Sequence, residues 1–503
     1  MYLGLDIGTS VIKAALFGTD GREIAEAARR AALAPAPPGW SEVEAEDVWQ
    51  AACAVLSELL AGRDTSQLRG IGLTGVMVGA WLTGGDGAVL RRPILWNDAR
   101  AQGLIDRKLR EMPDLYPAVF SESGSVMQLG CTLPVLAWLA ENEPETLARA
   151  RHALPAKDYI RFRLTGEIAT DESESAMAPG SARDRGFSAA QAERLGVGGL
   201  TGLLAPVRRG ETLAGHVTRA AAKATGLPEG LPVAIGTGDT SACVLGAGCH
   251  AAGQAASVLG TTCLNGVLSD RPLFEPEQGL LFIVPGGLWM RTMVNVAGTT
   301  VLDWALATLC SELAQGPRPY EAMEALARSA PAHAGGLVFV PYLSASGVIA
   351  PRIEPGARAG FMGLAPQHGR PEMLRAVYEG IAHAIAHCFG DIALPLSEIR
   401  LSGGGARSAF WSQMIADATG TPVLVPEGSQ FGAKGAALCL ATAIGDFASV
   451  REASAATSRV LRTHLPDPAA AALFREAAGT YRIAADAALG PLAGMQPPGA
   501  HPA

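Results

Sequence analysis

The chain has 503 residues, of which 49% are hydrophobic and 17% charged, so its composition excludes a disordered polymer of low hydrophobicity. Its 48 acidic and 40 basic side chains leave a net charge of −8, which argues against a nucleic-acid binder, because such proteins carry a basic surface. The eight cysteines form no C-x-x-C pair, no apolar run is long enough to cross a bilayer, and the N-terminus does not resemble a secretory signal. We therefore expect a cytoplasmic protein that has no membrane partner.

The first half of the chain alternates short apolar runs with segments of helical periodicity, which is the pattern of an α/β protein. A Gly-Thr-Ser turn separates the first two apolar runs. Strands are predicted over 2–5, 14–17, 71–74, 94–96 and 232–235, and helices over 47–61 and 240–245.

A glycine-rich break over 245–253 precedes a second series of the same kind. Asp467 followed by Pro468 is typical of a helix start, because Asp caps free N–H groups and proline fits the first turn. The Pro- and Gly-rich residues after position 490 are expected to be frayed. Strands are predicted over 255–259, 263–268 and 398–401, and helices over 299–309, 372–389, 408–418 and 469–489.

The two series share a short repeat. The segment LDIGTS at 5–10 resembles VLGTT at 258–262, each with an apolar run before and after a hydroxyl-rich turn. Asp6 has no counterpart in the second copy, where Val258 takes its place. The match indicates either two homologous halves that face each other across a cleft or a chance likeness between short segments.

The first of these turns could bind phosphate. Residues 6–10 offer a glycine, two hydroxyl groups and free backbone N–H groups, which suit phosphate oxygens, and Asp6 suits a hydrated Mg²⁺. Lys13 could add positive charge. The alternative is a plain hairpin in which Asp6 only helps to form the turn.

A second candidate is the segment Gly-Thr-Gly-Asp-Thr at 236–240, between an apolar strand and a helix. Asp239 could act there as a general base that takes a proton from a hydroxyl. The alternative is that Asp239 caps the helix that follows, which is a common role for Asp.

Two further segments carry weaker signals. Residues 96–100 (WNDAR) end a predicted strand with groups that suit a sugar, namely hydrogen-bonding side chains and an aromatic plate, but a capped helix start explains them equally well. Lys157 and Asp158 are read in the same way. Three glycines at 403–405 leave bare backbone after a strand, which suits a nucleotide or a simple turn.

Other catalytic motifs are missing from the sequence. It contains neither the dinucleotide-binding fingerprint, nor the G-x-x-x-x-G-K-[ST] phosphate loop, nor the G-x-S-x-G nucleophile elbow. His383 and His387 have the spacing of metal ligands but no obvious third ligand, so we interpret them as packing histidines.

Taken in order, these pieces resemble the FGGY family of carbohydrate kinases, closest to its xylulokinase-like branch, over residues 1 to about 490. The matching stretches are GLDIGTS at 4–10, LWNDAR at 95–100, KDY at 157–159, GD at 238–239, LGTT at 259–262 and GGGAR at 403–407. GFMGL at 360–364, Glu372 and YEG at 378–380 resemble the C-terminal signature of the family.

The resemblance implies an α/β fold of two actin/hexokinase-like (ribonuclease H-like) domains that face a central cleft. It divides the chain into an N-terminal sugar-binding domain over 1–245, a C-terminal nucleotide-binding domain over 246–445, a closing helical segment over 446–490 and a flexible tail over 491–503.

The resemblance also assigns roles. Asp239 corresponds to the catalytic base, and Asp6 and Asp239 would hold Mg²⁺. The residues that would contact ATP are Thr9, Ser10, Lys13, Gly260, Thr261 and Thr262 at the phosphates, and Gly404 and Gly405 at the adenosine. The residues that would line or brace the sugar pocket are Met77, Val78, Trp96, Asn97, Asp98, Arg100, Asp239 and Thr240.

The chain departs from the xylulokinase pattern in the expected sugar pocket. Val78 stands where xylulokinases have histidine, Thr240 where they have asparagine, and Val135 where they have lysine. Since unmatched buried polar groups cost about 1–3 kcal/mol each, a less polar pocket argues against D-xylulose itself. Another pentulose, a polyol such as erythritol, or a deoxy sugar would suit it better.

We therefore predict an ATP-dependent kinase that transfers the γ-phosphoryl group to a hydroxyl of a pentulose or polyol, with ATP and Mg²⁺ as cofactors. The altered pocket leaves one alternative, a non-catalytic sensor of sugar or nucleotide on the same fold. An actin-like ATPase is a third interpretation. A homodimer is left open.

Overall fold

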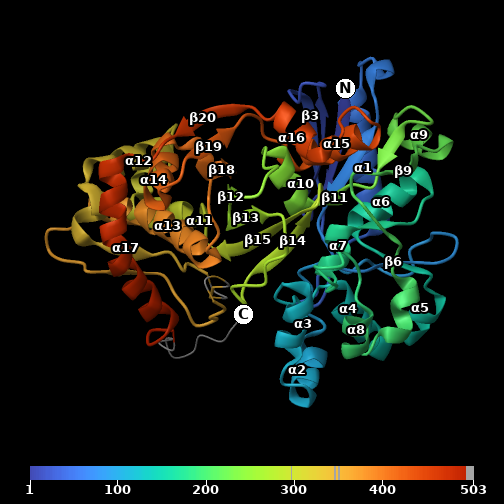
Figure 1. The fold of residues 1–503 in the computed structure, drawn as a ribbon, viewed down its shortest axis with the longest axis horizontal. Coiled ribbons are helices and arrows are strands. Elements are labelled where there is room, and N and C mark those ends of the chain that lie inside the picture. The colour runs from blue at the N-terminus through green and yellow to red at the C-terminus, as the bar shows by residue number, and fades with distance from the viewer. Residues whose placement is uncertain (296, 345–346, 349, 351, 494–503) are drawn as a thin grey trace.

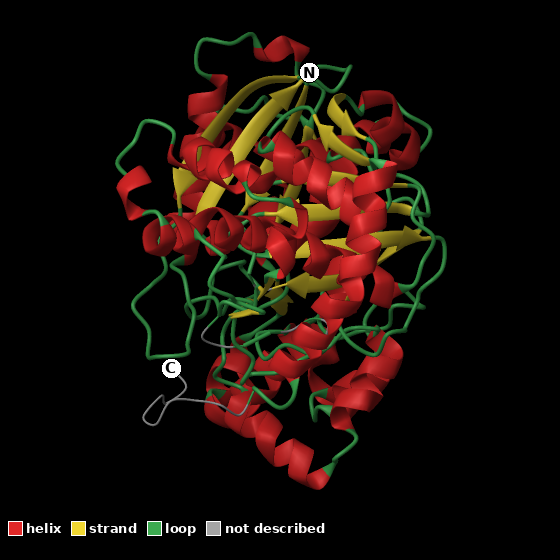
Figure 2. Ribbon diagram, turned by 90° about the vertical axis from the view of Figure 1, so that its left-hand side faces the viewer, coloured by secondary structure: helices red, strands yellow, loops and turns green. Residues whose placement is uncertain are grey.

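The computed structural model describes residues 1–295, 297–344, 347–348, 350 and 352–493, which contain two seven-stranded sheets with helices around them. Figure 1 shows the N-terminal half, in blue and green, beside the C-terminal half, in yellow to red. In the side view of Figure 2, the strands lie inside and helices cover them. The predicted α/β class is confirmed.

The first sheet has the strand order β3-β2-β1-β4-β10-β9, and β11 also pairs with β4. Strands β1, β2 and β3 are antiparallel neighbours, whereas β4 is parallel to β1, β10 and β11. Four of the predicted strands are confirmed here as β1, β2, β4 and β10. The strands are β1 Tyr2–Ile7, β2 Val11–Phe17, β3 Glu23–Arg30, β4 Ile71–Gly75, β9 Leu213–His216, β10 Pro232–Ala234 and β11 Thr237–Gly238.

The second sheet repeats this topology in the order β14-β15-β13-β12-β18-β19-β20. Again an antiparallel hairpin, β12–β13, lies beside parallel strands, β18 and β19. The short repeat in the sequence therefore marks two halves of the same architecture, with a Gly-Thr turn at the centre of each sheet. The strands are β12 Gln254–Leu259, β13 Cys263–Ser269, β14 Leu280–Val284, β15 Leu288–Asn295, β18 Glu398–Ser402, β19 Val423–Pro426 and β20 Val460–His464.

Long amphipathic helices cover both sheets, and each predicted helix is present. The side chain of Asp467 accepts hydrogen bonds from the backbone N–H groups of Ala469 and Ala470 at 3.0 and 2.9 Å, which confirms the predicted cap. The main helices are α1 Ala45–Leu60, α6 Ala156–Thr165, α9 Arg219–Thr225, α10 Asp239–Gly246, α11 Thr300–Leu309, α12 Pro319–Ser329, α13 Arg370–Ile392, α14 Ala409–Thr419, α15 Phe431–Ala443, α16 Val450–Thr457 and α17 Pro468–Leu489.

An insertion between β4 and β9 forms a mostly helical lobe, which Figure 1 shows at the lower right. Most of its helices pack around a separate hydrophobic core. They are α2 Gln102–Glu111, α3 Leu115–Ser123, α4 Thr132–Asn142, α5 Pro144–Arg149 and α8 Ala189–Arg194. Helix α7 Glu172–Met177 lies instead against β14 and β11. The short strands are β5 Trp81–Thr83, β6 His152–Leu154, β7 Thr170–Asp171 and β8 Val207–Arg208 here, and β16 Val338–Val340 and β17 Gly360–Met362 in the C-terminal half.

Glycines join the two halves. Helix α15 packs against β1, β4 and α10, so a helix of the second half lies on the first sheet. A Cβ atom on Gly4, Gly72 or Gly435 would lie 1.8–1.9 Å from a backbone carbonyl oxygen across this contact. Because no side chain fits there, only glycine allows the helix and strands to approach this closely. We call the contact between α15 and β1, β4 and α10 the junction.

Two local predictions need correction or restriction. The predicted strand at 94–96 is wrong: Ile94 makes isolated bridges to Glu42 and Ala80, and the chain then turns, with the Asp98 N–H bonded to the Leu95 carbonyl. Most of the flexible tail predicted over 491–503, namely 494–503, lies outside the described residues. In the described part of the chain, none of the helices combines the length and hydrophobicity needed to cross a bilayer.

Candidate active site

Asp6 and Asp239 stand at the carboxyl ends of two strands, β1 and β11, that pair in parallel with the two sides of β4. Asp6 lies opposite Thr74 in the pairing of β1 with β4, and Thr237 lies opposite the same Thr74 in the pairing of β11 with β4. Asp239 follows β11 as the first residue of α10. Adjacent strands are about 4.8 Å apart, so one intervening strand leaves about 10 Å between the two backbones. The topology therefore brings both carboxyl groups to one edge of the sheet.

The negative charge of Asp239 acts on Asp6. Burial and then the negative charge of Asp239 raise the pKa of Asp6 to about 7, while Lys13, its register partner on β2, acts in the opposite direction. Burial raises the pKa of Asp239 to about 6, opposed by hydrogen bonds from Thr240, whose backbone N–H lies 2.6 Å away. Shifts of this kind gather at catalytic sites, because an acid with a pKa near neutrality can exchange protons.

Asp239 does not cap its helix. The cap position of α10 belongs to Gly238, and Asp239 is the first residue within the helix. Its Oδ1 accepts instead from the backbone N–H and the hydroxyl of Thr240, at 2.6 and 3.3 Å. The interpretation of Asp239 as a helix cap is therefore wrong.

Two residues beside the acids were missed by the sequence analysis. Burial and the charges of Asp6 and Asp239 raise the pKa of the Cys243 thiol, which lies one helical turn after Asp239. Gly432, in the first turn of α15, is so close to Asp6 that a Cβ atom there would lie 2.9 Å from the Asp6 Oδ2 atom. The sequence signal for the second contact is a glycine inside a helix, which usually has a packing reason.

Met77 and Val78 lie next to the strand that leads into Asp239. A Cβ atom on Gly238 would lie 2.5 Å from the Met77 sulfur, so Met77 packs against β11. Val78 has a φ of 56°, a left-handed conformation that is strained for a β-branched residue. Its backbone N–H donates to Glu174 Oε2 at 2.7 Å, so a buried acid of α7 holds this strained backbone.

The predicted sugar-pocket segment at 96–100 divides into an exposed and a buried part. Trp96 is 43% exposed, and its indole N–H donates to the Thr9 hydroxyl at 3.2 Å, so this segment adjoins the β1–β2 turn. Asn97 is exposed. Asp98 and Arg100 are buried in an ion pair of 2.8 Å, which stiffens the segment from behind.

Lys157 and Asp158 belong to a buried ionic cluster. The Lys157 ammonium lies 2.7 Å from Asp158 and 2.8 Å from Asp171, and Arg161 also pairs with Asp158. Burial raises the pKa of Glu174, which adjoins this cluster, well above its usual value. The cluster therefore supports the backbone of Val78 from the interior of the domain.

Some of the residues predicted to contact the nucleotide line a cavity of about 600 Å³ in the second half. Its lining residues include Thr299, Tyr378, Gly404, Gly405 and Trp411. The glycines form a short 3₁₀ turn, Gly404–Arg407, before α14 begins. A Cβ atom on Gly404 would meet nothing within 4 Å, so a ligand can lie against bare backbone there.

The Gly-Thr-Thr turn at 260–262 adjoins this cavity. The Thr299 N–H donates to the Gly260 carbonyl at 2.7 Å, and the Gly298 N–H donates to the Thr261 carbonyl at 2.9 Å. Thr299 also lines the cavity, so the turn and the cavity are continuous. Thr262 lies at the end of the same turn. Ser10 and Thr9 occupy the equivalent turn of the first sheet.

The predicted packing histidines lie in the C-terminal half. The His383 ring stacks on Tyr481 at a centroid distance of 5.0 Å, and burial lowers its pKa to about 4. His387 lies 3.4 Å from Asp391. Both therefore make local packing and polar contacts on α13.

Residues 1–246 match the model of the FGGY family of carbohydrate kinases, N-terminal domain, and residues 255–444 match that of its C-terminal domain. A xylulose kinase of Escherichia coli (strain K12) is 32% identical, with 96% of this chain and 98% of that protein covered. An erythritol kinase of Brucella abortus (strain 2308) is 30% identical, with 96% and 95% covered.

Solved structures of carbohydrate kinases share the fold of this chain. The xylulose kinase from Rhodospirillum rubrum matches with a TM-score of 0.88 and 29% identity, over 98% of this chain and 99% of that one. The gluconate kinase from Lactobacillus acidophilus also reaches a TM-score of 0.88, over 97% and 98%, and at 22% identity it shows the fold alone.

Proposed function

The chain belongs to the FGGY family of carbohydrate kinases, and we propose that its acceptor is a pentulose or polyol and that Asp239 is the general base. The observation that carries this assignment is the convergence of Asp6 and Asp239 at one edge of the first sheet, with a pKa near neutrality for each. A base with this pKa is ionised at neutral pH and still able to hold a proton.

In the proposed reaction, an acceptor hydroxyl binds beside Asp239 and attacks the γ-phosphorus of ATP. As the new O–P bond forms, the hydroxyl proton passes to the Asp239 carboxylate, and the bond to ADP breaks. Positioning and charge stabilisation supply most of the catalysis in phosphoryl transfer, and a general base adds about 10²–10⁴-fold. The hydrogen bonds from Thr240 orient the carboxylate for this role.

The residues at this edge suit a divalent cation. Two carboxylates that repel each other are relieved by a cation, and carboxylate oxygens are the ligands that Mg²⁺ prefers. We propose that Asp6 and Asp239 hold Mg²⁺, directly or through water. When bound, the ion would supply neutralisation of charge on the β- and γ-phosphates.

We assign the ATP phosphates to the two equivalent turns, at 9–10 with Lys13 and at 260–262. The adenosine would lie in the cavity at Gly404 and Gly405. The repeated architecture supports this assignment, because each sheet presents a hydroxyl-rich turn at the end of its central hairpin.

The acceptor class follows from the apolar side chains beside Asp239. Met77 packs against β11, and Val78 is held next to it, so this wall offers no side-chain hydrogen bond to a hydroxyl. The family contains relatives named xylulose kinase and erythritol kinase, which supports the search among pentuloses and polyols.

Cytoplasmic location also remains a proposal, supported by the eight free cysteines. The homodimer and the domain limits stay predictions.

The test is a coupled ADP-release assay over a panel of pentuloses, tetritols, pentitols and their deoxy analogues. We expect one acceptor to exceed the others by orders of magnitude in kcat/KM and to depend on Asp239. Silence across the panel, together with tight sugar binding by calorimetry, would establish the non-catalytic sensor instead. ATP hydrolysis without any acceptor would point to an actin-like ATPase. No feature of the described site favours either alternative.

A further inference from the structure

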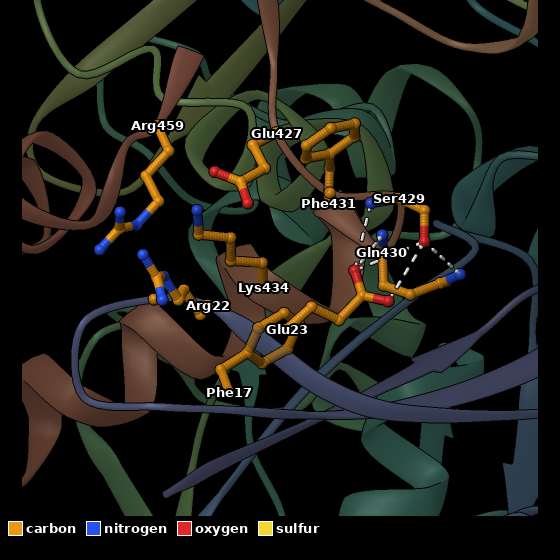
Figure 3. Close-up of a pocket in the computed structure, with 11 residues that line it drawn as sticks. Phe17, Arg22, Glu23, Glu427, Ser429, Gln430, Phe431, Lys434 and Arg459 are labelled. Atoms are coloured by element: carbon orange, nitrogen blue, oxygen red, sulfur yellow. Dashed lines mark hydrogen bonds between the residues drawn. The ribbon is translucent and has the colours of Figure 1, made fainter. Parts of the chain in front are cut away.

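A second, smaller cavity of about 180 Å³ lies away from the nucleotide cavity, where the turn between β2 and β3 meets the start of α15. Its walls come from residues 17–23 of the first half, residues 427–434 of the second, and Arg459 just before β20. We call it the hairpin pocket. Figure 3 shows its side chains. Because the first two segments match different domain models of the family, a ligand here would touch both halves.

Lys434 is the central residue of the hairpin pocket. Its side chain is 6% exposed, and its ammonium donates to the Thr457 carbonyl at 2.9 Å. Among the described residues, no carboxylate oxygen lies within 4.0 Å of it. An ammonium has three N–H donors, and burying its charge without a counter-ion is costly. Burial and the nearby Arg459 lower the pKa of Lys434 to about 8, although the more distant charges of Glu427, Asp20 and Glu23 act in the opposite direction. A counter-ion beside Lys434 would remove this cost.

Two guanidinium groups face the same space. Figure 3 shows the charged ends of Arg22 and Arg459 turned toward that of Lys434. Both guanidinium groups share one partner, Asp20, at 3.6 and 3.1 Å. The Nε atom of Arg459 is buried and has no hydrogen-bond partner in the described structure. Among the described residues, Asp20 is the one acid within ion-pair distance of any of these three cations, so an anion that enters the pocket would meet donors that are only partly used.

The acids of the hairpin pocket lie beyond ion-pair distance of the Lys434 ammonium in the described structure. The Glu23 carboxylate accepts from the backbone N–H groups of Ser429 and Gln430, at 3.1 and 3.4 Å, and is committed to them. Glu427 borders the pocket but is exposed to solvent and lies beyond ion-pair distance of Lys434. The under-used donors of Lys434 and Arg459 therefore remain for a ligand.

We propose that the hairpin pocket binds a phosphate group, either free phosphate or the phosphoryl end of a small phosphorylated metabolite. Charged N–H donors from three directions match the oxygens of a phosphate, and arginine suits them through its planar fork. The cavity leaves room beyond the phosphate for a small attached group.

A ligand in the hairpin pocket would act on the active site through the first turn of α15. Lys434 lies two residues after Gly432, whose backbone adjoins the Asp6 carboxylate. A phosphate that draws Lys434 and Arg22 together would tie the β2–β3 turn to the first turn of α15. The first turn of α15 also contains Gly432, which forms one wall of the Asp6 site. The reaction product of a carbohydrate kinase belongs to the same ligand class, so product binding here would adjust the active site.

The test is calorimetric titration of the full chain with inorganic phosphate. Three proteins are compared: wild type, Lys434→Met, and Lys13→Met, which removes a cation of the active site. Binding that weakens at least about tenfold in Lys434→Met and persists in Lys13→Met supports the proposal. Equal binding in wild type and Lys434→Met, with loss in Lys13→Met, overturns it, because phosphate then occupies the active site alone. Absence of binding to the wild type also overturns it.

A second variant and a second probe complete the test. Arg459→Gln keeps a partly exposed polar side chain and is expected to fold, so it checks the pocket even where Lys434→Met fails. It must weaken phosphate binding as well, and unchanged binding would overturn the proposal. Glycerol 3-phosphate distinguishes the sources: tighter binding than phosphate assigns the pocket to a phosphorylated metabolite, and weaker binding assigns it to the free ion.

Discussion

The negative charge of Asp239 acts on Asp6 across the strand that separates them. Burial and this charge together bring the pKa of Asp6 to about 7. The interaction exists because β1 and β11 pair with the two sides of β4 and end at the same edge of the sheet. An arrangement that disfavours two negative charges is useful only where a cation or a proton is handled, which is the reason for assigning catalysis to this pair.

Replacing Asp239 with asparagine tests the base. Asparagine keeps the size of the side chain and can still contact Thr240, but it accepts no proton. We expect kcat to fall by about 10²–10⁴-fold while the affinity for ATP stays within about twofold. Steady-state kinetics and nucleotide titration measure the two effects. Turnover above about a tenth of the wild-type value would remove Asp239 from this role.

The same substitution changes how stability depends on pH. An acid whose pKa is higher in the folded protein than in the unfolded chain stabilises the fold while it is protonated, and that stability is lost as pH rises through the folded pKa. Folding raises the pKa of Asp6 from 3.8 to about 7, so the wild-type protein loses stability as pH rises over that range. In Asp239→Asn, one such acid is gone and the pKa of Asp6 falls. Unfolding by urea between about pH 4 and pH 7 should give a shallower decline for the variant. Parallel curves would contradict the electrostatic pairing.

Glu174 is predicted to position the apolar wall of the acceptor site, formed by Met77 and Val78, through its hydrogen bond to the Val78 backbone. Glutamine at 174 can still accept the Val78 N–H bond, whereas leucine leaves that N–H unsatisfied beside a strained backbone. An unsatisfied buried donor costs about 1–3 kcal/mol, so Glu174→Leu should raise the acceptor KM by about 5- to 100-fold. The KM for ATP should not change.

The glutamine variant is the control for this prediction. Because burial raises the pKa of Glu174 and so favours its uncharged form, which glutamine resembles, Glu174→Gln should stay close to wild type in both KM values. A leucine variant with an unchanged acceptor KM would show that the bond to Val78 does not set the acceptor site. Thermal unfolding of both variants separates a local effect from a loss of fold.

Much of this architecture was predictable from the sequence because it depends on local patterns. The repeat at 5–10 and 258–262 indicated either two homologous halves or a chance likeness, and each copy forms the turn of a hairpin in its own sheet. Asp467 predicted a helix start from the chemistry of capping alone. The segment at 94–96 is a buried apolar run, a pattern that predicts a strand, but its backbone pairs only with isolated residues and then turns.

The remaining features arise from tertiary contacts that no local pattern records. Glu174 meets Val78 only because the insertion folds back behind β4. Gly432 meets Asp6 only because α15 crosses onto the first sheet. Motif similarity to the family could predict the role of Asp239, but its pKa depends on burial, which the sequence does not display.

A Gly→Ala substitution at the junction and one on an exposed helix face should have opposite effects on the free energy of unfolding. A Cβ atom on Gly435 would lie 1.9 Å from the Ala242 carbonyl oxygen, so Gly435→Ala should destabilise the protein by about 1–3 kcal/mol through overpacking. Gly479 lies on the exposed face of α17 and has nothing within 4 Å of its Cβ position. Gly479→Ala should therefore stabilise by about 0.5–1 kcal/mol. Chemical denaturation of both variants measures the difference, and equal effects would refute the close approach at the junction.

A side chain at Gly404 should block the nucleotide without disturbing the fold. The Cβ position of Gly404 is open and its φ is ordinary, yet the residue lines the cavity of about 600 Å³. Gly404→Leu therefore places apolar atoms where the adenosine is expected, and we predict an ATP KM at least about tenfold higher with the acceptor KM unchanged. Gly103→Leu is the matched control, because its Cβ position is equally open but lies on α2, outside this cavity. If both variants bind ATP like the wild type, the nucleotide does not lie against Gly404, and the adenosine site must be sought elsewhere on the second sheet.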